Sequence, residues 1–60
     1  MIKVEWRIHY VTHSGDEKQT VYFSQSPRVP RVGDYVDGLK VTRVEWDEGM
    51  ESATIELRES

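Results

Sequence analysis

Residues 29–41 read VPRVGDYVDGLKV, and the strand-forming segments of the chain lie on either side of them. Pro30 interrupts any strand that reaches it, because proline has no amide hydrogen to donate to a ladder. Gly33 suits a backbone conformation that a residue with a Cβ atom resists. Asp37-Gly38, flanked by apolar residues, is a strong signal for a two-residue β-hairpin. The segment therefore predicts a break, a turn, a short strand and a tight hairpin in succession.

The residues after this hairpin predict a strand with one irregularity. Leu39 and Val41 share one face of a strand, and so do Val44 and Trp46, but the two pairs are out of phase. One extra residue near Thr42-Arg43 brings both pairs to the same face. We therefore expect a β-bulge there.

The C-terminal residues predict the partner of this strand. Residues 52–58 alternate between apolar and polar side chains, which is the pattern of a half-buried strand. We expect Trp46 opposite Ala53 on the inner face. On the outer face we expect Arg43 opposite Glu56, an opposite-charge pair.

The N-terminal residues predict a long β-hairpin. Apolar and polar side chains alternate strictly from Ile2 to Tyr10, which is again typical of a half-buried strand. The cluster His13–Asp16 predicts a turn, and a second strand follows it. Together these segments predict five strands, at about residues 1–12, 17–25, 34–36, 39–46 and 52–58.

The register of this hairpin is predicted from its apolar residues. A turn of two or four residues makes the numbers of paired residues sum to 29. Ile8 then faces Val21, and Trp6 faces Phe23, so that the apolar side chains of both strands share one face. The same register puts Tyr22 on the outer face.

Sixty residues form one small domain, residues 1–60. We predict an all-β fold, which is either a five-stranded antiparallel, strongly bent sheet or an SH3-like small barrel. An open meander sheet that dimerises through a face or an edge is the alternative. In either fold, Val29 and Val32 are expected to cover one open end of the sheet.

Two parts of the chain resemble a known sequence signature. Residues 30–36, PRVGDYV, and residues 41–46, VTRVEW, are similar to the pattern Pro-x-x-Gly-(Asp/Glu)-x-Val … Val-x-x-Val-x-(Trp/His). This signature recurs in short, mostly uncharacterised bacterial and phage β-proteins. A similar Gly-Asp-x-Val segment begins a strand in SH3-like barrels of translation and transcription proteins. The resemblance covers roughly residues 27–57, and it implies a small SH3-like barrel without implying an activity.

The composition argues against several kinds of partner. The chain has no cysteine, and its net charge is −3 with a pI of about 5.2. Both signs of charge are mixed along the chain, which argues against electrostatic binding to nucleic acid or to anionic membranes. No apolar run is long enough to span a bilayer, and no signal peptide follows Met1. We therefore expect a cytoplasmic protein.

The sequence contains no recognisable catalytic or metal-binding set. There is no cysteine nucleophile, and no serine lies in a Gly-x-Ser-x-Gly elbow. His9 and His13 are the only histidines, and they would lie about 13 Å apart on one strand. The acidic turn Asp47–Glu51 lacks the spacing of a calcium loop. We predict no enzymatic activity, no cofactor, no metal site and no small-molecule substrate.

Two groups of side chains are candidate partner-binding sites. The first group lies in or beside the long loop and combines arginine with tyrosine, which are over-represented at protein interfaces: Arg28, Arg31 and Tyr35. The second group is predicted on the outer face of the first hairpin: Arg7, His9, Val11 and Tyr22, with Thr20 beside them. An ordinary solvated surface is the alternative interpretation of both groups.

We therefore predict a non-enzymatic small binding module that acts through protein–protein interaction. A homodimer and a phage-type inhibitor or accessory factor are two forms of this hypothesis. One alternative is a nucleic-acid-binding small β-barrel, which would bring together Arg28, Arg31, Lys40, Arg43 and Tyr35. The other alternative is a structural or assembly subunit that pairs through edge strands.

Overall fold

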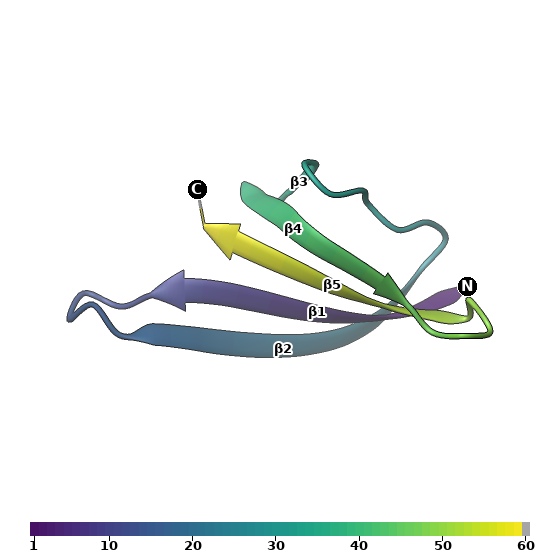
Figure 1. Ribbon diagram of the computed structural model, residues 1–60, viewed down its shortest axis with the longest axis horizontal. Helices are drawn as coiled ribbons and strands as arrows, with labels where there is room; N and C mark the ends of the chain where they lie inside the picture. Colours follow the sequence, from purple (N-terminus) through teal and green to yellow (C-terminus); the bar gives the residue numbers. More distant parts are fainter. Residues whose placement is uncertain (60) are drawn as a thin grey trace.

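The alternating segments of the sequence form the strands, and the computed structural model describes residues 1–59. The strands are β1 (Ile2–Val11), β2 (Glu17–Ser26), β3 (Tyr35–Val36), β4 (Leu39–Trp46) and β5 (Ser52–Glu59). They form one strongly curled sheet, a half-barrel, and no helix occurs in the described residues (Figure 1). The predicted all-β fold, with a strongly bent sheet or small barrel, is confirmed.

The sheet is mixed rather than wholly antiparallel, and in this respect the prediction is wrong. The strand order is β2-β1-β5-β4-β3, and β1 pairs with β5 in parallel, while the other pairings are antiparallel. The cause is the segment 27–34, which carries the chain from the β2 edge of the sheet to the β3 edge (Figure 1). Because Pro27 and Pro30 cannot donate to a ladder, no third strand forms beside β2. As a result, β5 arrives next to β1 running in the same direction.

The first hairpin has a register that differs by one residue from the predicted one. Paired residue numbers sum to 28, so that Trp6 lies opposite Tyr22. The difference moves Tyr22 to the concave face of the sheet, because side chains alternate along a strand. It also moves Val21 and Phe23 to the convex face, and Phe23 is 76% exposed.

The turn of this hairpin explains its register. The loop has three residues, because Thr12 N donates to Asp16 O at 2.9 Å and Gly15 N donates to Thr12 O at 2.9 Å. Gly15 has a φ of 88°, which is the left-handed conformation that ends a three-residue hairpin loop. A loop of two or four residues would give the predicted sum of 29, and a loop of three residues gives 28.

The second hairpin follows the prediction closely. Asp37 and Gly38 have φ values of 50° and 80°, and Val36 pairs with Leu39. These are the features of a two-residue turn with two left-handed residues. Gly33 is also left-handed, with a φ of 96°, as expected for the turn that precedes β3.

The pairing of β4 with β5 also follows the predicted register. Trp46 lies opposite Ala53, Arg43 lies opposite Glu56, and the ladder shifts between Val41 and Arg43. The shift is the predicted β-bulge. Because of it, the apolar residues on both sides of the bulge face the concave side of the sheet.

The core lies on the concave face and is small. In the described part of the chain, it consists of five buried side chains: Val4, Val41, Ala53, Ile55 and Leu57. Three of them come from β5, which has neighbours on both sides. Full burial of a large aliphatic side chain contributes about 1.5–3 kcal/mol to stability. The strands that hold these side chains, β1, β4 and β5, therefore contribute most of the hydrophobic stabilisation.

The segment 27–34 covers one part of the concave face. Val29 packs against the buried cluster, as predicted. Val32 does not, because it is 63% exposed. Arg31 N donates to Asp34 Oδ2 at 2.9 Å, and Asp34 N donates to Arg31 O at 3.0 Å. These bonds close a turn with Val32 at its tip, which keeps its side chain in solvent.

The molecule is elongated and leaves much of its surface uncovered. Its extents are 40 × 18 × 16 Å, and its radius of gyration is 12.0 Å, against about 10 Å for a compact domain of this length. The β1–β2 hairpin extends beyond the other strands (Figure 1). The accessible surface is 4676 Å², whereas a compact monomer of this mass exposes about 4,000 Å².

Candidate binding surface

The open side of the half-barrel forms a hollow of about 490 Å³ between the two edge strands. All five strands contribute to its wall. Its apolar lining consists mainly of Trp6, Ile8, Tyr22, Val36, Leu39 and Leu57. Because β2 and β3 do not pair with each other, the barrel stays open along this seam, and the hollow is accessible from solvent.

Two aromatic side chains form the β1–β2 wall of the hollow. Trp6 and Tyr22 are cross-strand partners on the concave face. The indole Nε1 of Trp6 donates to Ser24 Oγ at 2.7 Å, which satisfies the polar end of the ring. Tyr22 is 56% exposed. Aromatic rings with one polar end are typical of protein interfaces, where they bury a large apolar area and keep a hydrogen-bonding group.

The opposite wall of the hollow carries a carboxylate, Asp37. Asp37 lies in the tight turn between β3 and β4 and is exposed. Within residues 1–59, no lysine, arginine or histidine lines the hollow. A negative charge beside an apolar surface favours a ligand that carries a basic group next to apolar groups.

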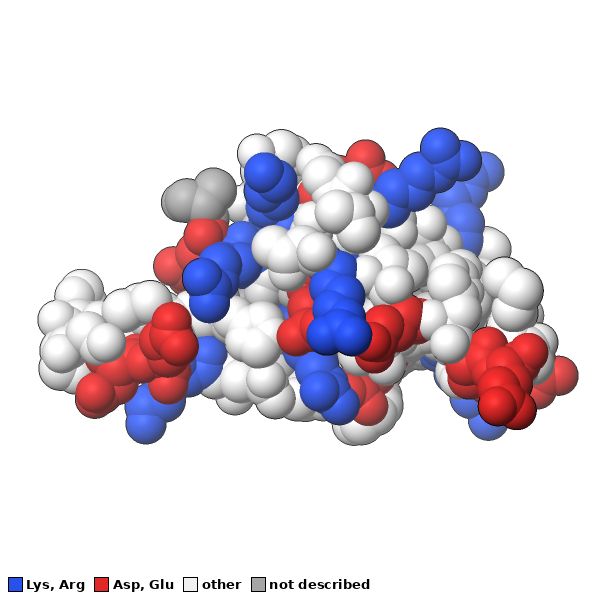
Figure 2. Space-filling view, in the orientation of Figure 1, with Lys and Arg blue, Asp and Glu red and all other residues white. Residues whose placement is uncertain are grey.

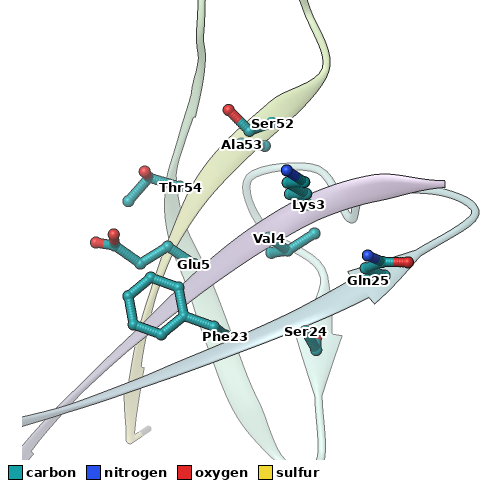
Figure 3. Close-up of a pocket in the computed structure, with 9 residues that line it drawn as sticks. All are labelled: Lys3, Val4, Glu5, Phe23, Ser24, Gln25, Ser52, Ala53 and Thr54. Carbon is teal, nitrogen blue, oxygen red and sulfur yellow. The ribbon is translucent and has the colours of Figure 1, made fainter.

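A second hollow, of about 540 Å³, lies where β2, β1 and β5 run side by side. Figure 3 shows the ring of Phe23 projecting to the same side of the sheet as Glu5 and Thr54. Glu5 is the cross-strand partner of Phe23 on β1, and Thr54 is the partner of Glu5 on β5. Phe23 therefore has polar neighbours on one side and the free edge of β2 on the other.

The charged side chains of the convex face interact with one another. Arg7 Nε donates to Glu5 Oε2, and this hydrogen bond together with the charge of Glu5 raises the pKa of Arg7. His9 Nε2 lies 3.0 Å from Glu56 Oε1, and Arg43 Nε lies 3.8 Å from Glu56 Oε2. Exposed ion pairs of this kind contribute little to stability. They keep positive and negative charge mixed across β1, β5 and β4.

The structure divides the predicted hairpin group between the two faces of the sheet. Arg7 and His9 lie on the convex face, where they contact carboxylates. Val11 is on the same face and is 57% exposed near the end of β1. Tyr22 lies on the concave face opposite Trp6. These residues therefore do not form one patch, because the observed register turns Tyr22 away from the others.

The predicted loop group is exposed but is not gathered in one hollow. Arg28, Arg31 and Tyr35 are all exposed. Arg31 lines a hollow of about 380 Å³ together with Trp46, whereas Arg28 and Tyr35 do not line it. Tyr35 pairs with Lys40 on the β3–β4 hairpin. The neighbourhood of Arg31 and Trp46 is a tertiary feature that is not predicted from the sequence.

Basic and acidic side chains are interspersed over the face of the molecule shown in Figure 2. Arg43, which the nucleic-acid alternative would use, interacts with Glu45 and Glu56. Binding to a phosphate backbone requires positive charges that are free to replace counterions. The positive charge of Arg43 is instead paired with carboxylates of its own chain.

Phe23, like Val21, is predicted from the sequence to lie on the inner face, and the structure places both on the convex face. Phe23 is predicted opposite Trp6, and it lies instead opposite Glu5 at the edge of the sheet. The segment Thr12–Gly15 holds the signal that could have placed it. A three-residue loop that ends on glycine is a common hairpin connection, and it implies the observed register.

Among residues 1–59, no three His, Cys, Asp or Glu side chains are grouped as metal ligands. The same part of the chain contains no helix with the length and apolar character needed to cross a membrane.

No protein-family model, curated protein or solved structure matches the chain. The resemblance of residues 30–46 to the bacterial and phage signature stays a prediction.

Proposed function

We propose that the chain is a non-enzymatic protein-binding module that holds an extended segment of a partner protein in the hollow between β2 and β3. The observation that supports this proposal is the apolar hollow of about 490 Å³ at the open seam, with walls from all five strands. A seam between two strand edges is long and shallow, which suits an extended segment better than a globular surface. The side chains of such a segment point alternately into the hollow and toward solvent.

The lining of the hollow also supports a binding role rather than catalysis. Among the described residues that line it, Asp37 and Tyr22 are the only candidates for an acid or a base, and they lie on opposite walls. General acid–base catalysis needs groups within hydrogen-bond reach of a reacting atom. Apolar contacts to Trp6, Leu39 and Leu57 would instead supply affinity through burial.

The partner segment is defined by this chemistry. Alternate positions carry apolar side chains that bury against Trp6 and Leu39. A lysine or arginine at one end lies next to Asp37, because the carboxylate is exposed at the rim of the hollow. Its contribution weakens as ionic strength increases, since exposed charges are screened.

Selection of binding segments from a library of random peptides tests the proposal. The protein carries Trp46→Phe so that Trp6 is its only tryptophan, and binding is followed by Trp6 fluorescence and by two-dimensional NMR. We expect the selected peptides to alternate apolar and polar residues, to contain a basic residue, and to shift the resonances of Trp6, Leu39 and Leu57. Asp37→Lys should weaken their binding at least tenfold, which corresponds to about 1.4 kcal/mol.

The matched control is Glu48→Lys, which changes the charge by the same amount at an exposed site outside the hollow. It should leave the affinity unchanged. Peptides that bind Asp37→Lys and the parent protein equally, and that shift resonances on the convex face instead, would contradict the proposal.

A further inference from the structure

β2 presents a long strand edge without the usual protection. It is an edge strand of ten residues, and its central run from Thr20 to Ser24 contains no charged residue, proline or glycine. Natural sheets usually protect exposed edges with charges, prolines or bulges, or keep them short. The other edge strand, β3, has only two residues. The β2 edge is therefore the place where another strand would pair.

The hydrogen bonds of the first hairpin show which backbone groups face this free edge. Thr12 N donates to Asp16 O at 2.9 Å, so this pair is of the hydrogen-bonded kind. Hydrogen-bonded and non-hydrogen-bonded pairs alternate along an antiparallel ladder. The even-numbered residues of β2 therefore direct their N–H and C=O groups toward β1. The odd-numbered residues, with Val21 and Phe23 at the centre, direct theirs outward.

Val21 and Phe23 also have uncovered side chains. Val21 is 38% exposed and Phe23 is 76% exposed. Both lie on the convex face, where their partners on β1 are Arg7 and Glu5. Because these partners are charged, the apolar side chains of Val21 and Phe23 have no apolar cover from the neighbouring strand.

We propose that two copies of the chain pair antiparallel through the free edges of β2, with Val21 of each copy opposite Phe23 of the other. The outward-facing N–H and C=O groups of two β2 strands meet only when odd-numbered residues lie opposite odd-numbered residues. The numbers of paired residues must therefore have an even sum. A sum of 44 (21 + 23) places Tyr22 on the two-fold axis and makes two Val21–Phe23 pairs. A sum of 42 would set Phe23 opposite Gln19, and a sum of 46 would set Val21 opposite Gln25. Aromatic and β-branched residues directly opposite each other are favourable cross-strand pairs.

The charges of β2 agree with this register. Lys18 lies opposite Ser26 of the second copy, and Gln19 lies opposite its Gln25, so no like charges meet. The accessible surface of 4676 Å² exceeds that of a compact monomer by roughly 600 Å². A standard interface buries about 800 Å² on each partner. This excess belongs to the whole elongated molecule, and the exposed side chains of Val21 and Phe23 are part of it.

This pairing has a geometric consequence for the hollow between β2 and β3. When the numbers of paired residues have an even sum, the two-fold axis is perpendicular to the sheet. The concave faces of both copies then lie on the same side. The dimer would present two hollows next to each other, with the two Tyr22 side chains between them. The pairing does not depend on peptide binding, because it uses the backbone edge of β2.

Sedimentation of the unmodified chain and of two lysine variants tests the dimer. We expect the unmodified chain to sediment at twice its mass of 7.0 kDa at high micromolar concentration. Phe23→Lys should sediment as a monomer, because it removes the Val21–Phe23 pairs, and its circular dichroism should be unchanged because the residue is exposed. Val32→Lys, at an exposed position outside β2, should remain a dimer. A monomeric unmodified chain would overturn the proposal and would leave the peptide-binding hollow untouched.

Single cysteines test the register, because the chain has none of its own. Residues on the two-fold axis form a non-hydrogen-bonded pair with Cα atoms about 4.5 Å apart, which a disulfide can bridge. Tyr22→Cys should therefore form a covalent dimer under mild oxidation. Val21→Cys should not, because the two copies of residue 21 are out of register. Cross-linking of Val21→Cys with none of Tyr22→Cys would rule out the proposed register, and no cross-linking of either variant would rule out the β2 interface.

Discussion

Trp6 lies directly opposite Tyr22 in the β1–β2 ladder, and both side chains face the concave side of the sheet. The indole N–H of Trp6 reaches two residues further along β2, to the next side chain on the same face, and donates to Ser24 Oγ at 2.7 Å. Both contacts exist only in the observed register. In a register shifted by one residue, Trp6 would face Phe23, and Tyr22 and Ser24 would point to the other face.

The Trp6–Ser24 hydrogen bond should contribute measurably to stability. We expect a double-mutant cycle of Trp6→Phe and Ser24→Ala to give a coupling energy of about 0.5–1 kcal/mol, because this is the net value of a typical hydrogen bond. The measurement is urea unfolding at one fixed protein concentration. Additive effects of the two substitutions would show that the bond makes no net contribution.

Gly15 should determine the stability of the first hairpin. Gly15→Ala should lower the free energy of unfolding by about 1 kcal/mol, because a residue with a Cβ atom resists the left-handed conformation, while no atom lies within 4 Å of the added group. Gly49→Ala is the matched control, since Gly49 is not left-handed and its Cβ would meet only Glu51 Cγ at 3.8 Å. Equal losses for both variants, measured by thermal unfolding, would contradict this role of Gly15.

The small core should tolerate very little loss of volume. Ile55 has no exposed surface, and Ile55→Ala should cost about 2–5 kcal/mol through lost burial and the cavity that remains. A domain of this length has a total stability of about 3–9 kcal/mol, so much of the variant should be unfolded at 37 °C. Val32→Ala, at an exposed position, should change stability by less than about 0.5 kcal/mol. Amide proton dispersion in NMR spectra distinguishes the two outcomes.

The turn between β4 and β5 should lose stability in acid through Asp47. Its side chain accepts hydrogen bonds from Ser52 Oγ at 2.9 Å, Ser52 N at 3.3 Å and Glu51 N at 3.0 Å, and these lower the pKa of Asp47. A carboxylate whose pKa is lower in the folded state stabilises the fold above its unfolded pKa, and this contribution is lost as pH falls through the folded pKa.

Comparison of Asp47→Asn with the unmodified chain tests this pH dependence. At neutral pH the variant should melt at a lower temperature, and the difference should disappear as the pH falls below the folded pKa of Asp47. Glu48→Gln removes the same charge from the same turn, and Glu48 makes no side-chain hydrogen bond in the described residues. If both variants depend on pH in the same way, the effect comes from net charge and not from the hydrogen bonds of Asp47.

Features that depend on neighbouring residues were predictable from the sequence. Asp37-Gly38 implies its own turn, because the two residues tolerate positive φ. The bulge between Val41 and Arg43 follows from a change of phase in the apolar residues. The observed limits of the five strands also agree with the predicted ones to within one residue. In each case the information lies in a short stretch of chain.

The predicted partner-binding residue Tyr22 lies in a segment whose orientation could not be predicted from the sequence. Val21, Tyr22 and Phe23 are consecutive and all apolar, so alternation cannot tell which of them face the core. The loop length decides, and it placed Tyr22 in the hollow and Phe23 at the free edge of β2. Leu39 and Trp6 are far apart in the sequence and meet in the hollow only because the sheet curls.

The sequence alone determined which residues form strands, where the second hairpin turns and where β4 bulges, because local backbone preferences and side-chain alternation decide these features. Only the tertiary structure decided that β1 and β5 are parallel neighbours and that β2 and β3 are opposite edges. Residues 27–34 cross from one edge to the other, and their path depends on burial of Val29 against strands distant in the sequence. The hollow and the free β2 edge both result from that crossing, since it leaves the two edge strands unpaired.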